Sequence, residues 1–111
     1  MRKFQSRSED AVRVLAFFRA KHGNGKELEK VLFTLIEPTR SEPGNIAYVL
    51  HRSTEDPDEL VFDEIFESME AFRRHAQKPY IKNLIQKISH LIVAPPDVKT
   101  YSEIRVALKP L

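Results

Sequence analysis

Apolar and polar side chains alternate in four stretches of the chain, and a period of two is typical of β-strands. The stretches span residues 11–20, 44–52, 60–67 and 98–104. Two other stretches, 26–37 and 68–92, carry apolar residues every three or four positions, which predicts amphipathic helices with one buried side. The predicted order is therefore strand, helix, strand, strand, helix, strand.

Proline and glycine predict where these elements break. Pro38 lies inside the first helical pattern and should kink or end that helix, and Pro43 followed by Gly44 should stop it. Ser68 is a predicted N-cap of the second helical stretch. Pro79 interrupts that stretch and suits the first turn of a new helix.

This order of elements predicts an α+β fold of the ferredoxin-like β-α-β-β-α-β type. Right-handed crossovers place both helical stretches on one face of a four-stranded antiparallel sheet. The opposite face is then bare although it carries apolar side chains, namely Leu15, Phe17, Ala47, Val49, Val61 and Ile65. A bare apolar face of this size favours a second copy packed against it, so we expect a homodimer joined through the sheet faces.

The chain of 111 residues suits one domain, expected over residues 11–104, between a flexible N-terminal tail at 1–10 and a C-terminal tail at 105–111. The first ten residues lack the apolar core of a signal peptide, and no apolar run approaches the ~20 residues of a membrane span. Cysteine is absent, so disulfides and thiolate metal sites are excluded. We expect a cytoplasmic protein without a membrane partner.

Charge and motifs exclude several function classes. The net charge is only +2, which makes a poor footprint for nucleic acid. RNA-binding domains of this topology need aromatic and basic residues on the open sheet face, where this chain has Asp63 and Glu67 with Phe17 as the single aromatic. The three glycines form no phosphate-binding loop, and the four histidines have no ligand spacing, so we expect no metal site.

His75 and Glu64 are the predicted catalytic residues. His75 lies at the border of the buried helix face just before the break at Pro79, where an imidazole can act as a base near neutral pH. Glu64 lies between Phe62 and Phe66 on one face of a strand, so its carboxylate must be paired or have a raised pKa. Two alternatives stay open for it: a salt bridge with an arginine, or a pocket carboxylate that partners His75 or a substrate hydroxyl.

Aromatic residues on the same side are core residues first and pocket walls second. Tyr48 needs a partner for its hydroxyl if it is buried, and Tyr80 beside the helix break could cap a pocket. The predicted substrate-binding set comprises Tyr48, Phe62, Phe66, Phe72, Tyr80 and Arg40.

Three segments of the sequence, residues 39–48, 63–66 and 71–80, together resemble the antibiotic biosynthesis monooxygenase domain family. The pattern P-T-R-x-E-P-G at 38–44 and the pattern A-F-x-x-H-x-x-x-P at 71–79 carry the resemblance. It extends over about residues 12–104 and implies a dimeric α+β barrel. Arg40 belongs to the first pattern, where it could also close a salt bridge at the end of the first helix.

The resemblance implies a function that uses no metal or flavin. Members of the family oxidise quinol-type aromatics with O2, so a small aromatic substrate and O2 are the expected partners, and no cofactor is expected. Other members isomerise small signalling molecules, and a branch degrades haem with an Asn, a Trp and a His. Phe18, Phe66 and Ile85 stand at those three positions here, which argues against haem degradation. A non-catalytic binding or structural dimer is the alternative, because fold does not fix function.

Overall fold

Four strands form one antiparallel sheet in the order β2-β3-β1-β4, as predicted. The computed structural model describes residues 9–104; the predicted tail at 105–111 and most of the one at 1–10 lie outside that range. The strands are β1 (Val12–Arg19), β2 (Asn45–Arg52), β3 (Glu59–Phe66) and β4 (Asp97–Ser102). β1 lies in the centre and pairs with β3 and β4, while β2 and β3 form a hairpin. The ferredoxin-like α+β prediction is confirmed.

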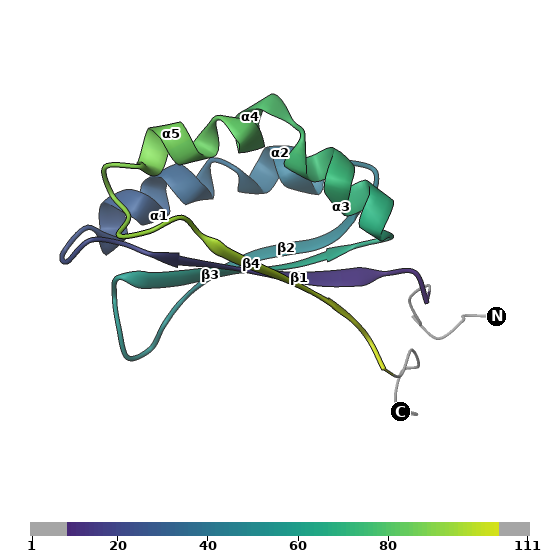
Figure 1. Ribbon diagram of the computed structural model, residues 1–111, viewed down its shortest axis with the longest axis horizontal. Helices are drawn as coiled ribbons and strands as arrows, with labels where there is room; N and C mark the ends of the chain where they lie inside the picture. The colour runs from purple at the N-terminus through teal and green to yellow at the C-terminus, as the bar shows by residue number, and fades with distance from the viewer. Residues whose placement is uncertain (1–8, 105–111) are drawn as a thin grey trace.

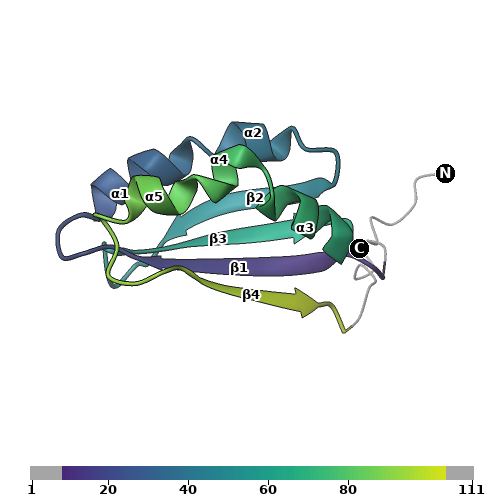
Figure 2. The same ribbon diagram turned by 45° about the horizontal axis from the view of Figure 1, so that its top comes forward.

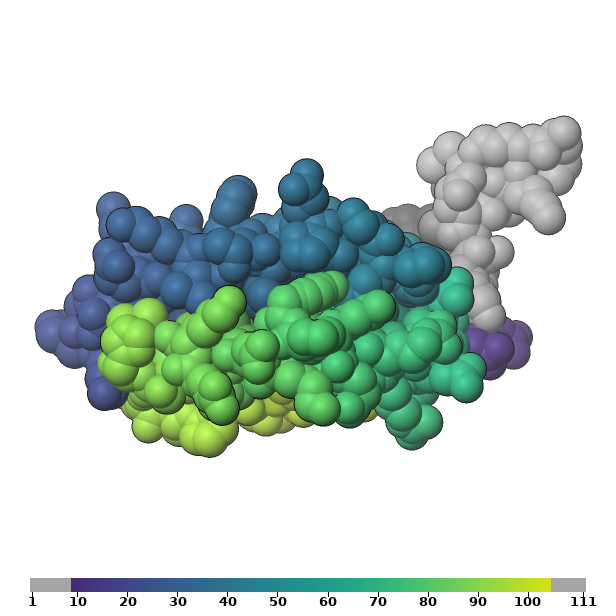
Figure 3. Space-filling model, turned by 90° about the horizontal axis from the view of Figure 1, so that it is seen from above, coloured from purple at the N-terminus to yellow at the C-terminus, as the bar shows by residue number. Residues whose placement is uncertain are grey.

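Helices cover one face of the sheet and leave the other face without a layer (Figure 1). The first row contains α1 (Gly25–Phe33) and α2 (Ile36–Arg40), and the second contains α3 (Met69–Ala76), α4 (Pro79–Lys82) and α5 (Leu84–Ile88). Seen from above, the two rows lie side by side, blue and green (Figure 3). Among residues 9–104, no helix combines the length and apolar character that a membrane crossing needs.

The first helical stretch breaks earlier than its proline. α1 ends at Phe33 and α2 begins at Ile36, so Pro38 lies in the first turn of α2. A proline ring clashes with the carbonyl of the residue four positions earlier, which is Thr34. The helix therefore breaks at Thr34, whose carbonyl would clash with the Pro38 ring. Pro38 has no backbone N–H, but no hydrogen bond is lost, because N–H groups in a first helical turn have no acceptor within the helix.

The second helical stretch divides at Pro79, as the sequence predicts, and again at Asn83 between α4 and α5, which the sequence does not predict. Ser68 caps α3, and its hydroxyl accepts a hydrogen bond from the Ala71 amide at 3.0 Å. Lys78 is extended at φ −61° and ψ 139°, the conformation that a following proline favours, and Pro79 begins α4. This interruption turns the chain just after His75.

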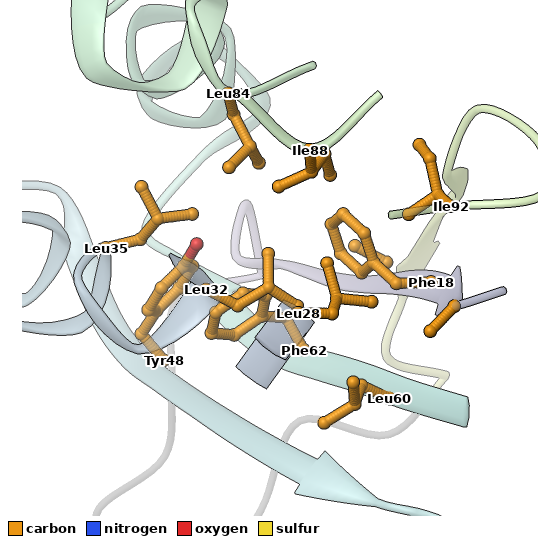
Figure 4. Close-up of a cluster of buried hydrophobic side chains, with 12 residues drawn as sticks. Phe18, Leu28, Leu32, Leu35, Tyr48, Leu60, Phe62, Leu84, Ile88 and Ile92 are labelled. Atoms are coloured by element: carbon orange, nitrogen blue, oxygen red, sulfur yellow. The ribbon is translucent and has the colours of Figure 1, made fainter. Parts of the chain in front are cut away.

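The main core lies between the helices and the sheet (Figure 4). Phe18, Phe62 and Tyr48 from three strands meet apolar side chains of both helix rows. Strict alternation along β2 would place Ile46 on the same face as Tyr48, but Ile46 is 52% exposed. A bulge between Asn45 and Ala47 shifts the register there, because two residues of β2 stand against one of β3.

β4 lies at the edge of the sheet, next to β1 (Figure 2). All six of its residues are exposed. On the open face, Leu15, Phe17 and Val61 are half-buried and Val49 is 38% exposed. Ile65, also placed on this face by its pairing with Arg13, is only 7% exposed and is thus already shielded within one chain.

Candidate functional site

A cavity of about 170 Å³ lies between the sheet and the second helix row. Its walls are apolar except for three side chains, Tyr48, Glu64 and His75. The remaining wall residues are Ala16, Phe18, Leu35, Phe62, Phe72, Ala76, Ile81, Leu84, Ile85, Pro96 and Val98. The structure thus brings both predicted catalytic residues, together with Tyr48, Phe62 and Phe72, to one cavity.

His75 stands in the last turn of α3 with its side chain 4% exposed. Its imidazole packs among the rings of Phe66 (centroids 4.9 Å apart), Tyr48 (5.7 Å) and Phe72 (6.2 Å). Burial lowers the pKa of His75, and its hydrogen bond to Glu42 offsets only part of that effect. The ring is therefore a neutral imidazole at pH 7.

Glu42, in the loop between α2 and β2, hydrogen-bonds to the Nδ1 side of this imidazole. Its carboxylate oxygens lie 3.0 and 3.2 Å from His75 Nδ1. A carboxylate only accepts hydrogen bonds, so Nδ1 carries the proton and Nε2 keeps a free lone pair. Tyr80 also donates its hydroxyl to Glu42.

Gly44 lets the Glu42 loop approach α3 closely. A Cβ at this position would lie 2.5 Å from the Cβ of Ala71, nearer than real Cβ contacts allow. Only glycine fits between the start of β2 and the helix that carries His75. α2 already ends at Arg40, before Pro43, and Gly44 determines how closely the loop with Glu42 approaches His75.

Glu64 reaches the cavity from the middle of β3. Its Oε1 lies 4.0 Å from His75 Nε2 and has no hydrogen-bond partner among residues 9–104. Burial, with the nearby charges of Asp63 and Glu42, raises the pKa of Glu64 to about 8. No arginine among residues 9–104 forms a salt bridge with Glu64, so of the two alternatives the pocket carboxyl is favoured, and its raised pKa keeps it protonated at pH 7.

Two tyrosines complete the polar side of the site. Tyr48 on β2 is 2% exposed and stacks on Phe62 at 4.3 Å between ring centroids. Burial, reinforced by the charge of Glu64, raises the pKa of Tyr48 well above its usual range, so it stays a neutral phenol. Burial and the hydrogen bond to Glu42 raise the pKa of Tyr80 to about 12.

The other predicted binding residues lie outside the cavity wall. Arg40 donates from Nε (3.1 Å) and Nη2 (2.8 Å) to the Tyr48 carbonyl, so it ties α2 to β2 and makes no salt bridge there. Phe66 belongs to a separate buried cluster with Val12 and Val14 and supports His75 from the far side. Tyr80 does not line the cavity, and its hydroxyl donates to Glu42.

Glu42 is the functional residue that sequence reasoning missed. It stands in the P-T-R-x-E-P-G pattern, and a carboxylate just before a Pro-Gly turn was the available signal. Its pairing with His75, 33 positions later, depends on how the loop and α3 pack on the sheet. Periodicity along the chain carries no information on such a contact.

Residues 9–104 contain no group of three or more histidine or acidic side chains arranged to hold a metal ion. The chemistry that the described side chains can provide is proton transfer. Nε2 of His75 can accept a proton from a ligand hydroxyl, and the neutral Glu64 carboxyl can donate a hydrogen bond to the oxygen that remains.

Comparison with known proteins places this arrangement in a family. A model of the family described as antibiotic biosynthesis monooxygenase matches residues 11–87, more than half of the chain. The chain belongs to this antibiotic biosynthesis monooxygenase family. The matched residues include Glu42, Glu64 and His75.

Solved structures share the fold of this antibiotic biosynthesis monooxygenase family member. Protein SO0527 from Shewanella oneidensis has a TM-score of 0.82 and 29% identity, with 91% of this chain and 97% of that chain covered. Rv0793 from Mycobacterium tuberculosis has a TM-score of 0.80 and 28% identity, with 88% and 99% covered. A structure described as an antibiotic biosynthesis monooxygenase has a TM-score of 0.77 at 23% identity, with 85% and 99% covered.

A curated relative is longer than this chain. The uncharacterized protein sll1783 of Synechocystis sp. is 29% identical over 94 residues. These residues cover 85% of this chain and 64% of the relative, so the chain spans less than two thirds of that protein's length.

Proposed function

We propose that the protein is a cofactor-independent monooxygenase that oxidises a small quinol-type aromatic with O2. The observation that carries the proposal is a buried neutral imidazole whose Nε2 faces an apolar cavity beside a neutral carboxylic acid. Family membership supports the reaction class. A cavity remains where Phe side chains could have filled the space, which favours catalysis or ligand binding over a purely structural dimer.

The reaction balances without an outside reductant. A hydroquinone and O2 yield a hydroxyquinone and water: one oxygen atom forms a new C–O bond on the ring, and the other takes two protons and leaves as water. The substrate supplies all four electrons. Removing a phenolic proton makes the ring electron-rich enough to begin this transfer, so the protein needs to supply a base and a dry cavity.

Each polar residue then has a distinct role. His75 Nε2 takes the phenolic proton, and Glu42 fixes the tautomer and orientation of the ring, as an orienting carboxylate does for other histidine bases. Glu64 donates a hydrogen bond to the phenolate oxygen, which stabilises the charge that develops there. Phe62 and Phe72 form walls of the cavity.

We also propose that the active form is a homodimer joined through the open sheet faces. Leu15, Phe17, Val49 and Val61 carry apolar surface on the side of the sheet that the helices leave bare (Figure 1). A second copy is the partner that matches this face in shape and polarity, because it presents the same surface.

Oxygen consumption with methylhydroquinone, without added metal or flavin, tests the reaction. We expect His75→Ala to lower the rate ~10²–10⁴-fold, the usual share of a general base. Glu42→Gln should lower the rate less, because its amide oxygen can still accept a hydrogen bond from Nδ1–H. The rate should still fall, because the amide NH2 group can instead donate to Nδ1, so the tautomer is no longer fixed. The matched controls are His90→Ala and Glu37→Gln, which change exposed residues outside the cavity.

Labelled O2 gives the decisive readout, since a monooxygenase places one labelled atom in the quinone and the other in water. An unchanged rate in both site variants would show that the site is misplaced. Binding of quinols without turnover across a broad panel would instead support the non-catalytic binding dimer.

A further inference from the structure

We propose that the cavity is specific for an uncharged phenol or hydroquinone with a single ring, whose hydroxyl bridges His75 Nε2 and the Glu64 carboxyl. This inference rests on the proposed function and adds the substrate class to it. Cavity size, an unpartnered buried oxygen and the charges around the cavity support it independently.

The size of the cavity matches one aromatic ring. Its volume is about 170 Å³, and a protein cavity of about 150 Å³ with similar aliphatic and aromatic walls holds benzene. A second fused ring would extend beyond this volume towards solvent, past the partly exposed Ile85 and Val98, and would gain less burial. Leu84 and Ile85 from α5 and Leu35 from the end of the first row close it from the helix side.

The polar end of the cavity requires a ligand oxygen. Glu64 Oε1 is buried, with its side chain 5% exposed, and no described residue hydrogen-bonds to it. Such buried atoms are rare in native proteins because leaving them unpaired costs free energy. His75 Nε2 lies 4.0 Å away, so one oxygen about 2.8 Å from each atom fits between them.

A hydroxyl satisfies both groups with the correct hydrogen-bond sense. It donates its proton to the Nε2 lone pair, which is free because Glu42 holds the proton on Nδ1. It accepts a hydrogen bond from the Glu64 carboxylic acid. An ether or a carbonyl can only accept, and would leave Nε2 without a donor.

The surrounding charges exclude an anionic ligand. None of the lysines and arginines in residues 9–104 lines the cavity, and Glu42 lies on the Nδ1 side of His75. A carboxylate or phosphate buried here would have no countercharge and would face the negative Glu42, which is costly in an apolar site. The specificity therefore depends on the lack of basic side chains in the cavity wall as well as on the presence of His75 and Glu64.

Anaerobic titration calorimetry of the full-length protein separates binding from turnover. The panel is methylhydroquinone, its analogue with carboxylate in place of methyl, toluene, benzylamine and naphthohydroquinone. We expect methylhydroquinone to bind at least ~10-fold more tightly than each of the other four. For toluene this ratio corresponds to the loss of one buried hydrogen bond of about 1.4 kcal/mol. For the charged ligands the cause is an unpaired buried charge, and for naphthohydroquinone it is the size of the cavity.

Variants assign this preference to Glu64. Glu64→Leu should weaken methylhydroquinone binding ~10-fold and leave toluene binding unchanged or tighter, whereas Glu64→Gln, which keeps a donor, should weaken it less. Glu67→Gln is the matched control, an exposed acid just after the same strand. Circular dichroism and a thermal melt of each variant establish that the protein is folded.

Equal or tighter binding of the carboxylate, the amine or the two-ring quinol would overturn the proposal, as would a Glu64→Leu variant that is folded and binds methylhydroquinone normally. Turnover of a two-ring or anionic substrate would keep the oxygenase function and reject this substrate class. Selective methylhydroquinone binding without O2 consumption would keep the substrate class and reject the oxygenase function.

Discussion

At the scale of single residues, the site is defined by the opposite pKa shifts of two neighbouring groups. Burial lowers the pKa of His75 and raises that of Glu64 to about 8, so both are neutral at pH 7. Two neighbouring titratable groups whose environments shift their pKa values in opposite directions are typical of an acid and a base that act as a pair. Glu42 lies behind the pair, 3.0 Å from His75 Nδ1, and orients the base.

This pair predicts a bell-shaped dependence of kcat/KM on pH. The acid limb should lie below pH 6.5, the ordinary pKa of histidine, because His75 must be unprotonated to act as the base and burial lowers its pKa. The alkaline limb should lie near pH 8, where Glu64 loses its proton. Four groups face His75 or lie near it: Glu42, Glu64, Tyr48 and Lys78. Their charges and hydrogen bonds contribute to the pKa values that set the two limbs.

Steady-state kinetics of wild type and Glu64→Gln check this assignment. The variant should keep the acid limb and lose the alkaline limb, because its amide does not titrate. An alkaline limb that persists in Glu64→Gln would contradict the role given to Glu64.

Glu64 also predicts how stability depends on pH, independently of activity. The folded pKa of about 8 lies above the ordinary value of 4.5, so between these values the folded protein holds a proton that the unfolded chain has lost. The stability associated with this group is complete below about pH 4.5 and is lost as the pH rises towards about 8. Urea unfolding at several pH values should therefore show a smaller loss of stability for Glu64→Gln than for wild type, and equal slopes would contradict the buried neutral carboxyl.

At the scale of elements, the breaks in the helices determine where the polar residues of the site lie. Pro38 divides the first row, and the loop after α2 then carries Glu42 to the end of the second row. Lys78 and Pro79 end α3 just after His75, and α4 then brings Tyr80 back to Glu42. The close approach of this loop to α3 depends on Gly44 and Ala71.

Gly44→Ala should therefore lower both stability and activity. Its new Cβ would lie 2.5 Å from that of Ala71, so α3 must shift away from β2 and the Glu42–His75 hydrogen bond must lengthen. We expect a loss of about 1–3 kcal/mol in the free energy of unfolding, as for other overpacked sites. Thermal melts and O2 consumption measure the two effects.

Ala71→Gly in the same chain provides the matched rescue. It removes the opposing Cβ and should restore the activity of Gly44→Ala, although a glycine in the α3 interior itself costs about 1 kcal/mol of stability. A double variant with activity as low as Gly44→Ala alone would show that the contact with Ala71 is not the cause.

At the scale of the whole molecule, one layer of helices covers a four-stranded sheet and leaves its other face bare (Figure 1). Val49 at 38% exposed and half-buried Leu15 and Phe17 lie on that face. Ile65, which the sequence also places there, is buried within the single chain and would add little to an interface.

We predict a stable dimer at micromolar concentration that buries more than ~1,200 Å² in total. Val49→Asp places a charge in the proposed interface and should give monomers or aggregates, whereas Lys30→Asp on the exposed side of α1 should leave the dimer intact. Light scattering with size-exclusion chromatography measures the mass, and a native wild-type monomer would reject the dimer.

The sequence by itself determined the order and type of the elements, the face of the sheet that most strand residues take, and the two residues with candidate chemistry. These depend on local patterns: the period of the apolar residues, the Ser68 cap and the breaks at proline and glycine. Burial of Glu64 among apolar neighbours was already expected from Phe62 and Phe66 on either side of it. The bulge that exposes Ile46 left no such local signal, because it arises from the pairing of β2 with β3.

Only the tertiary structure decided which groups meet. Glu42 and His75 lie 33 positions apart, and their hydrogen bond exists because Gly44 lets the loop approach α3. The same packing places Phe66 and Arg40 outside the cavity wall, although the sequence predicts both as substrate-binding residues. Contacts between distant segments depend on the combined geometry of several elements, and a site built from such contacts is fixed only when the whole domain packs.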